Sequence, residues 1–193
     1  YHWTGTGQWQ PLAPPSPPMG PSTRQFGHGD RTFSTHAMSK AEIKGWLAAL
    51  QQSSAHLREA GFDGIMLHVS HATLISQFLS PYFNERTDEY GGSLANRMRF
   101  LIEAIQNARE GAGNQMAIGM RLNCDELVPG GYGTDTAREI VSTVCDRGLL
   151  DFVDLDVGLE PQQFYHGMPP AFAPVQFYRP WVEKVRSAAG KVP

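Results

Sequence analysis

The chain has 193 residues, of which 41% are hydrophobic, 10% aromatic and 18% charged, a composition typical of a globular protein. Its formal net charge is −3, and the absence of a basic stripe argues against a nucleic-acid partner. No apolar run approaches the ~18 residues of a membrane span, so we expect no membrane partner. No secretory signal is visible, which favours a cytoplasmic protein. Because the first residue is Tyr1 rather than Met, we expect a native start upstream, and the absence of a signal carries little weight.

The two cysteines, Cys124 and Cys145, are too few for a disulfide framework or a metal cluster. We expect both to be reduced thiols, as is usual in the cytosol.

Residues 1–38 differ in composition from the rest of the chain. Six prolines fall between Pro11 and Pro21, and proline both fixes φ and removes a backbone donor. We therefore predict a long Pro/Gly-rich loop segment over 1–38, followed by a regular α/β portion over 39–193. Loops longer than ~15 residues in compact domains are usually functional or disordered.

Regular structure begins with a predicted helix that runs to about Ala60. Ser39 followed by Glu42 forms a capping box at its start, and Gly61 ends it. Further helices are predicted over 96–110, from Thr134 to about 147, and over 175–189. Pro180 fits the last of these only if that helix begins near Arg179 or kinks.

Three short apolar runs between these helices predict buried strands, at 65–68, 116–122 and 152–157, and residues 190–193 resemble the entry to another. Alternating helices and strands indicate parallel strands joined by helical crossovers, in a doubly wound sheet or a (β/α) barrel. No GxGxxG follows any strand, so a dinucleotide-binding unit is unsupported. A complete (β/α)8 barrel needs about 250 residues, so the chain forms either an open sheet or a piece of a barrel.

The most informative chemistry follows the first predicted strand. His68 and His71 leave its carboxyl end, where parallel architectures bind their ligands. Two imidazoles that converge there can hold a carbonyl, an amine or a developing anion. The alternative is a pair of histidines that pack in a polar layer. A zinc site is disfavoured because no third ligand stands at a useful spacing, so we predict no metal.

A charged, glycine-containing segment comes next. Arg86, Asp88 and Arg97 are expected to form an internal ion-pair network, which is a structural role. Ser93 or a neighbour is expected to cap the following helix.

Two runs of sequence are long enough to be compared with known families. The first runs from Ala60-Gly61-Phe62-Asp63-Gly64 through His68 and His71 to Gln77-Phe78-Leu79-Ser80-Pro81. The second is Asn84-x-Arg86-Thr87-Asp88-Glu89-Tyr90-Gly91-Gly92-Ser93-Leu94-x-Asn96-Arg97. Both runs resemble the Old Yellow Enzyme, or NADH:flavin oxidoreductase, superfamily. The likeness covers about 38–158 and, more loosely, the proline-rich start. It implies an FMN-dependent oxidoreductase on a (β/α)8 barrel, with NAD(P)H as a candidate electron donor.

The resemblance also assigns places in the barrel. The three strands correspond to the fourth, fifth and sixth, and the segment 1–38 to the loop after the third. The chain is then an incomplete (β/α)8 TIM barrel, without the loops after strands seven and eight that hold the FMN phosphate. We expect completion by other chain segments or a homo-oligomer. An iron–sulfur cluster would belong only to regions outside this chain.

Residue by residue, the resemblance implies roles for a few side chains. His68 and His71 match the paired substrate-binding positions at the flavin. Arg121 matches an arginine that contacts the flavin near N1 and the C2 oxygen; the alternative is an inward arginine held by barrel carboxylates. Thr73 stands where the ene-reductase branch has a tyrosine proton donor. Tyr165, after the sixth strand, is a weaker candidate for binding substrate, through cation–π contact with an amine.

These features favour hydride transfer between a small organic substrate and flavin. The missing tyrosine at Thr73 places oxidative demethylation of an amine, as in the trimethylamine dehydrogenase and N-methyl-amino-acid demethylase branch, slightly ahead of alkene reduction. The alternative within the superfamily is an NAD(P)H-dependent ene-reductase. The alternative from another class is a non-catalytic, incomplete barrel fragment.

Overall fold

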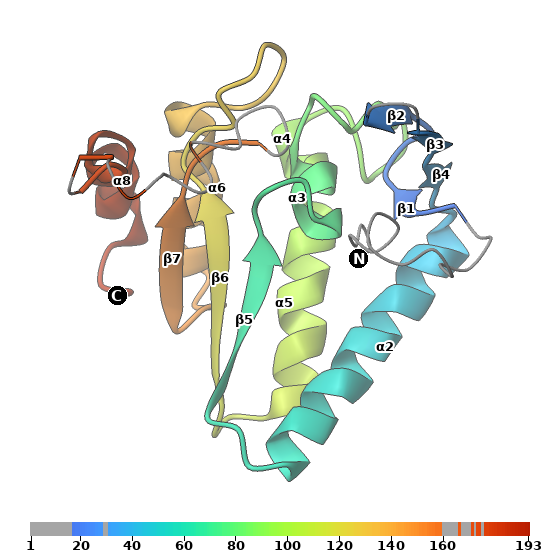
Figure 1. The fold of residues 1–193 in the computed structure, drawn as a ribbon. Helices are drawn as coiled ribbons and strands as arrows, with labels where there is room; N and C mark the ends of the chain where they lie inside the picture. Colours follow the sequence, from blue (N-terminus) through green and yellow to red (C-terminus); the bar gives the residue numbers. More distant parts are fainter. Residues whose placement is uncertain (1–16, 29–30, 160–165, 167–170, 172, 175) are drawn as a thin grey trace.

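The centre of the fold is a sheet of three parallel strands (Figure 1). The computed structural model describes residues 17–28, 31–159, 166, 171, 173–174 and 176–193. The strands are β5 (Gly64–Val69), β6 (Ala117–Asn123) and β7 (Phe152–Asp156), and they are neighbours in that order. The three predicted strands, their parallel pairing and their order are confirmed, whereas residues 190–193, expected to enter a further strand, form none.

The helices alternate with these strands as the sequence predicts. They are α2 (Lys40–Glu59), α3 (Leu74–Leu79), α4 (Leu94–Arg97), α5 (Arg99–Ala112), α6 (Thr134–Asp146) and α8 (Arg179–Arg186), with a 3₁₀ turn η1 (Ser187–Ala189) after the last. No helix in the described ranges is long and apolar enough to cross a membrane.

The predicted helix boundaries are close to the observed ones. The capping box of Ser39 and Glu42 is formed, and α8 begins at Arg179 with Pro180 in its first turn, as the sequence allows. Three features of the helices differ from the prediction. The helix expected from residue 96 is two helices that meet at Met98. Thr134 is the first residue of α6 rather than its cap, and helix α3 was not predicted.

Only one face of β5 is covered. Leu67 and Val69 are buried in the core, whereas Met66, which points to the other face, is 47% exposed, and His68 is exposed as well. Successive side chains on a strand point to opposite faces, so this alternation means that the packing elements lie on one side. A doubly wound sheet would bury both faces. The open face of the sheet, on the side of Met66 and His68, is where a barrel would have its interior.

The prediction that residues 1–38 form a loop without regular structure is wrong over part of the segment. Strand β1 (Met19–Gly20) pairs in parallel with β4 (His36–Ala37), and β2 (Gln25–His28) pairs antiparallel with β3 (Arg31–Ser34). The prolines, which prevent ladder hydrogen bonds, end at Pro21, and the longer pair β2–β3 follows them. Strand β1 is limited to the two residues between Pro18 and Pro21. The boundary between 1–38 and 39–193 stays a prediction.

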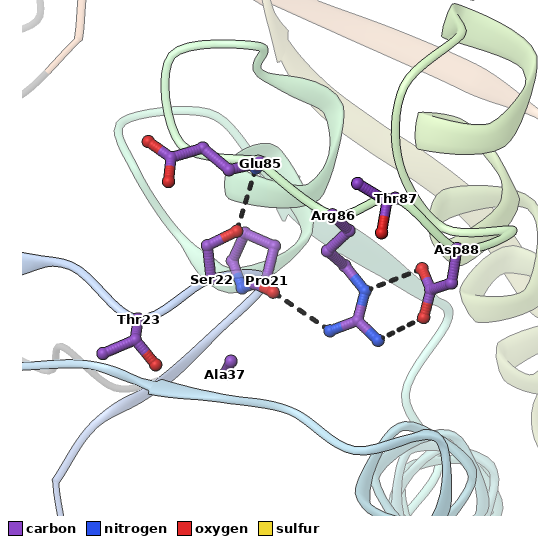
Figure 2. Close-up of a pocket in the computed structure, with 8 residues that line it drawn as sticks. All are labelled: Pro21, Ser22, Thr23, Ala37, Glu85, Arg86, Thr87 and Asp88. Atoms are coloured by element: carbon purple, nitrogen blue, oxygen red, sulfur yellow. Dashed lines mark hydrogen bonds and ion pairs between the residues drawn. The ribbon is translucent and has the colours of Figure 1, made fainter.

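Arg86 ties this N-terminal segment to the loop after α3 (Figure 2). One guanidinium nitrogen donates to the carbonyls of Pro21 (3.0 Å) and Met38 (2.7 Å), and the other two donate to the carboxylate of Asp88 (3.0 and 2.6 Å). The same loop is held by a bond from the Glu85 amide to the Ser22 hydroxyl (2.9 Å). A shallow cavity of about 360 Å³ lies here, lined in part by Pro21, Ser22, Glu85, Arg86 and Asp88.

The expected ion-pair network is therefore confirmed for Arg86 and Asp88 but not for Arg97. The guanidinium of Arg97 donates to the carbonyl oxygens of Leu79 (2.7 Å) and Gly92 (2.5 Å). Helix ends and turns leave unpaired carbonyls that a cation can satisfy, and Arg97 lies closer to these than to Asp88.

Helices α2 and α5 cross with almost no space between their backbones. A Cβ added to Gly111 of α5 would lie 2.0 Å from the carbonyl oxygen of Gln51 in α2. Arg58 of α2 donates to the Gly111 carbonyl at 2.8 Å, so the contact is also hydrogen-bonded. The glycine is required by this close approach.

We expect Gly111→Ala to lower the free energy of unfolding by about 1–3 kcal/mol, because the added methyl group must push the two helices apart. Gly45→Ala is a matched control, since a Cβ at Gly45 meets nothing within 4 Å. It should instead raise stability by roughly 0.5–1 kcal/mol through helix propensity. Urea denaturation of both variants measures this, and equal effects would contradict the close crossing.

Candidate functional site

The parallel register places three polar side chains in one row at the carboxyl end of the open face. His68 of β5 lies beside Arg121 of β6, which lies beside Asp154 of β7. Residues paired in this way point to the same face of a sheet. The row of candidate site residues is therefore set by strand pairing alone.

An apolar floor lies one row below, toward the amino ends of the strands. Met66 is paired with Gly119, and Gly119 with Phe152. The ring of Phe152 lies directly over Gly119, where an added Cβ would be 2.3 Å from the ring. The open face thus combines a flat apolar surface with charged groups at its upper edge.

The carboxylate of Asp156 joins two of the predicted site residues. It is fully buried, and its Oδ2 accepts from His71 Nε2 (2.6 Å) and Arg121 Nε (2.7 Å), while a second Arg121 nitrogen also pairs with it. The Val157 amide donates to Oδ1 at 2.8 Å. Arg121 also approaches Asp154 at 3.5 Å. One carboxylate therefore binds both His71 and Arg121.

These contacts keep Asp156 ionised. Burial acts to raise its pKa, but the hydrogen bond and charge of His71, the Val157 amide and the charge of Arg121 together outweigh burial and lower the pKa. A buried carboxylate with these partners stays charged at neutral pH.

His71 reaches Asp156 because the chain turns sharply after β5. Both His71 (φ 55°) and Ala72 (φ 60°) have left-handed backbone conformations, which cost about 1–2 kcal/mol each in non-glycine residues. The turn is held by the Thr73 hydroxyl, which lies 2.7 and 2.9 Å from the carbonyl oxygens of His68 and Ser70. Gln77 Nε2 donates to the Ala72 carbonyl at 2.7 Å. Such strain is typical of functional sites.

The imidazole of His71 is hydrogen-bonded at both nitrogens. Nε2 meets Asp156, and Nδ1 lies 3.2 Å from the Gly158 carbonyl. Both partners are acceptors, so the arrangement is fully satisfied when both nitrogens carry protons. Its side chain is 11% exposed, so the ring is largely buried.

The ring of His68 is more exposed and lies 5.8 Å from that of His71 between centroids. Partial desolvation, with the positive charges of His71 and Arg121, lowers the pKa of His68. His68 is therefore neutral at pH 7. Its Nδ1 lies 3.2 Å from the Ser70 hydroxyl, which leaves Nε2 for a ligand.

The structure thus brings His68, His71 and Arg121 together, as the sequence predicts. Arg121 is also held by carboxylates, which was the alternative expectation for it. The hydroxyl of Thr73 is engaged with the backbone, and Tyr165 lies outside the described residues. Cys124 and Cys145 are free thiols, and burial raises the pKa of Cys124 to about 12. Among the described residues, no group of three or more His, Cys, Asp or Glu side chains could hold a metal ion.

Sequence reasoning missed Asp156, the residue that organises the site. The available signal was the Asp154-Leu155-Asp156 spacing, which places two carboxylates on one face of a strand at the same end of the sheet as Arg121. It also missed Asn123, which is paired with Asp156 in the next row.

A second buried carboxyl, Glu126, fixes the loop after β6. Its Oε2 accepts from the Ser80 hydroxyl (2.7 Å) and the Tyr132 amide (2.8 Å), whereas Oε1 is buried without a partner in the described part of the chain. Burial raises the pKa of Glu126 to about 7, and the two hydrogen bonds offset this only in part. Glu126 thus joins the end of α3 to this loop in a largely neutral form below pH 7.

The model of the NADH:flavin oxidoreductase / NADH oxidase family matches residues 8–156. The chain belongs to this family. This confirms the resemblance drawn from the two sequence runs.

Three relatives of this chain are named for different substrates. It is 37% identical to the NADPH dehydrogenase of Clostridium acetobutylicum over 142 residues, which are 73% of this chain and 41% of the relative. It is 39% identical to the N,N-dimethylglycine/sarcosine dehydrogenase of Chromohalobacter salexigens over 101 residues, 52% of this chain and 15% of the relative. The structure of histamine dehydrogenase from Rhizobium sp. 4-9 matches with a TM-score of 0.69 and 33% identity, covering 75% of this chain and 21% of that one. The chain therefore spans less than half the length of each.

We expect Glu126→Gln to stabilise the protein increasingly as pH rises from about 5 to 8. The native carboxyl binds its proton more tightly than the unfolded one, so the wild type loses up to roughly 3 kcal/mol across this range. Glutamine mimics the neutral carboxyl and does not titrate. Denaturation of both proteins at several pH values measures the difference, and a constant difference would contradict the raised pKa.

Proposed function

We propose that the chain forms the substrate-facing part of an FMN-dependent oxidoreductase that acts on a small organic molecule. The observation that carries this proposal is the meeting of His68, His71 and Arg121 at one end of the open face, in a member of a flavin oxidoreductase family. NAD(P)H is the candidate electron partner in this family.

The open face has the chemistry that a flavin needs. Arg121 is 35% exposed beside the apolar floor formed by Met66 and Phe152, so a flat ring can lie on the floor with its polar edge toward a cation. When bound, FMN supplies the acceptor or donor of a hydride. Arg121, held in place by Asp156, would stabilise negative charge on the reduced ring.

The two histidines supply the substrate contacts. His68 presents a neutral imidazole whose Nε2 has no partner among the described residues, and His71 presents a ring that Asp156 orients. A neutral imidazole nitrogen can accept a hydrogen bond from an ammonium group or donate one to a carbonyl. His68 can therefore hold a polar group on the substrate directly, and His71 can join it by exchanging its 3.2 Å contact with the Gly158 carbonyl for the substrate.

Within this class we place oxidation of an N-methylated amine first. The Thr73 hydroxyl lies within hydrogen-bond distance of two backbone carbonyls. No phenol stands at this position to supply the proton that an alkene needs when it is reduced. Two of the relatives described above are named for dehydrogenation of amines. Both features favour an amine substrate.

Alkene reduction with NADPH is the second candidate, and the match to an NADPH dehydrogenase supports it. The third is a part of a barrel without activity of its own. The open face would then be covered by further strands or by another copy of the chain. Strand β7 is at the edge of the three-stranded sheet, and its Val153 amide donates to the Pro193 carbonyl at 2.9 Å. This bond shows that the edge of β7 can pair with a further segment of backbone, as a continuing sheet requires.

Anaerobic mixing of the FMN-loaded protein with candidate reductants separates these functions. We expect dimethylglycine or sarcosine to bleach the flavin absorbance, because the histidine pair holds an amine substrate. If NADPH bleaches the flavin, the two amines do not, and an enone then reoxidises it, alkene reduction replaces amine oxidation as the proposed function. Failure to retain FMN would support the third.

Substitutions at Arg121 and His71 should have different effects. Arg121→Met should make the flavin reduction potential more negative, because the charge near the reduced ring is lost, while Arg121→Lys should restore most of it. His71→Gln should raise KM for substrate and leave flavin content near the wild-type value. Potentiometry measures the reduction potential, and steady-state kinetics measure KM. If the potential shifts in His71→Gln but not in Arg121→Met, His71 rather than Arg121 is the residue that acts on the flavin.

A further inference from the structure

The carboxamide of Asn123 is the most costly unexplained polar group near the site. Asn123 is fully buried, and neither its Oδ1 nor its Nδ2 has a hydrogen-bond partner in the part of the chain that the structure describes. A buried amide that loses its bonds to water without gaining others pays the full desolvation penalty. Native proteins keep few such groups, and each calls for a physical explanation.

Its position on the sheet is defined by the register. Asn123 is the last residue of β6 and is paired with Asp156, and it follows Arg121 by two residues on the same face. Two residues along a strand span roughly 6.6 Å. The amide therefore extends the polar edge of the site beyond Arg121, toward the carboxyl end of the sheet.

The neighbouring groups do not account for Asn123. Asp156 is already satisfied by His71, Arg121 and the Val157 amide. The unused donor and acceptor of Asn123 lie side by side on one planar group, which matches a ligand edge that also offers a donor and an acceptor together. The pyrimidine ring of a flavin has such an edge, where the N3–H lies between two carbonyl oxygens.

We propose that the Asn123 carboxamide hydrogen-bonds the pyrimidine edge of bound FMN, next to the contact made by Arg121. This inference rests on the proposed function. The amide turns toward the open face when the ring binds, and its Oδ1 accepts from N3–H while its Nδ2 donates to a ring carbonyl. Binding thus satisfies two groups that are unsatisfied in the protein without ligand.

Asn123→Leu distinguishes a ligand contact from a structural one, because the two roles predict opposite signs. Leucine removes the unsatisfied amide at similar volume, so the FMN-free protein should melt at the same or a higher temperature. The Kd for FMN, measured by quenching of flavin fluorescence, should rise about tenfold through loss of two hydrogen bonds. Asn114→Leu, in an exposed turn before β6, is the matched control and should leave the Kd unchanged.

A flavin analogue tests the contact directly. FMN methylated at N3 lacks the donor, so it should bind the wild type several-fold more weakly than FMN, while Asn123→Leu should bind the two equally. An unchanged Kd for FMN in Asn123→Leu would overturn the contact. If the FMN-free form of this variant also melts at a lower temperature, the amide binds an internal water instead. Failure of the wild type to bind FMN at all would refute the proposed function, and the contact with it.

Discussion

The site depends on the burial of one carboxylate. Asp156 is removed from water at the end of β7, and a buried charge must be balanced by opposite charge and hydrogen bonds. Arg121 from β6 and His71 from the turn after β5 provide this balance. Removing one partner of such a group typically costs about 3–5 kcal/mol, so the ends of three strands are held together by the groups that form the site. The left-handed backbone at His71 and Ala72 is a cost that this network offsets.

The most specific sequence signature has a different role. The run from Asn84 to Gly92 builds a loop, in which Asn84 Nδ2 donates to the Phe78 and Tyr90 carbonyls and Gly91 leaves no room for a side chain against Arg86. Arg86 then fastens the N-terminal segment to this loop. The run that identifies the family most clearly thus supports the architecture, whereas the chemistry is carried by a few residues at strand ends.

Much of the scaffold was predictable because its signals are local. The capping box at Ser39 and the apolar runs of the three strands define elements without reference to tertiary structure. The strands near the N-terminus were not predictable, since their pairing depends on contacts between residues as distant as Met19 and His36. The grouping of His68, His71 and Arg121 followed from the polarity of parallel strands. The spacing of Asp154 and Asp156 places both carboxylates on one face of β7, but the role of Asp156 was missed because it also depends on the sharp turn at His71 and on burial, which the spacing does not reveal.

The hydrogen bond between His71 Nε2 and Asp156 is the interaction to measure first. A proton in such a charge-assisted bond is shielded from exchange and gives a strongly downfield imidazole N–H signal in proton NMR. We expect one such signal, assigned to His71 by 15N labelling, in the wild type and its loss in Asp156→Asn, with the signals of the α2–α5 core unchanged. A wild-type spectrum without this signal, or an Asp156→Asn spectrum that keeps it, would contradict the conclusion that Asp156 organises the site.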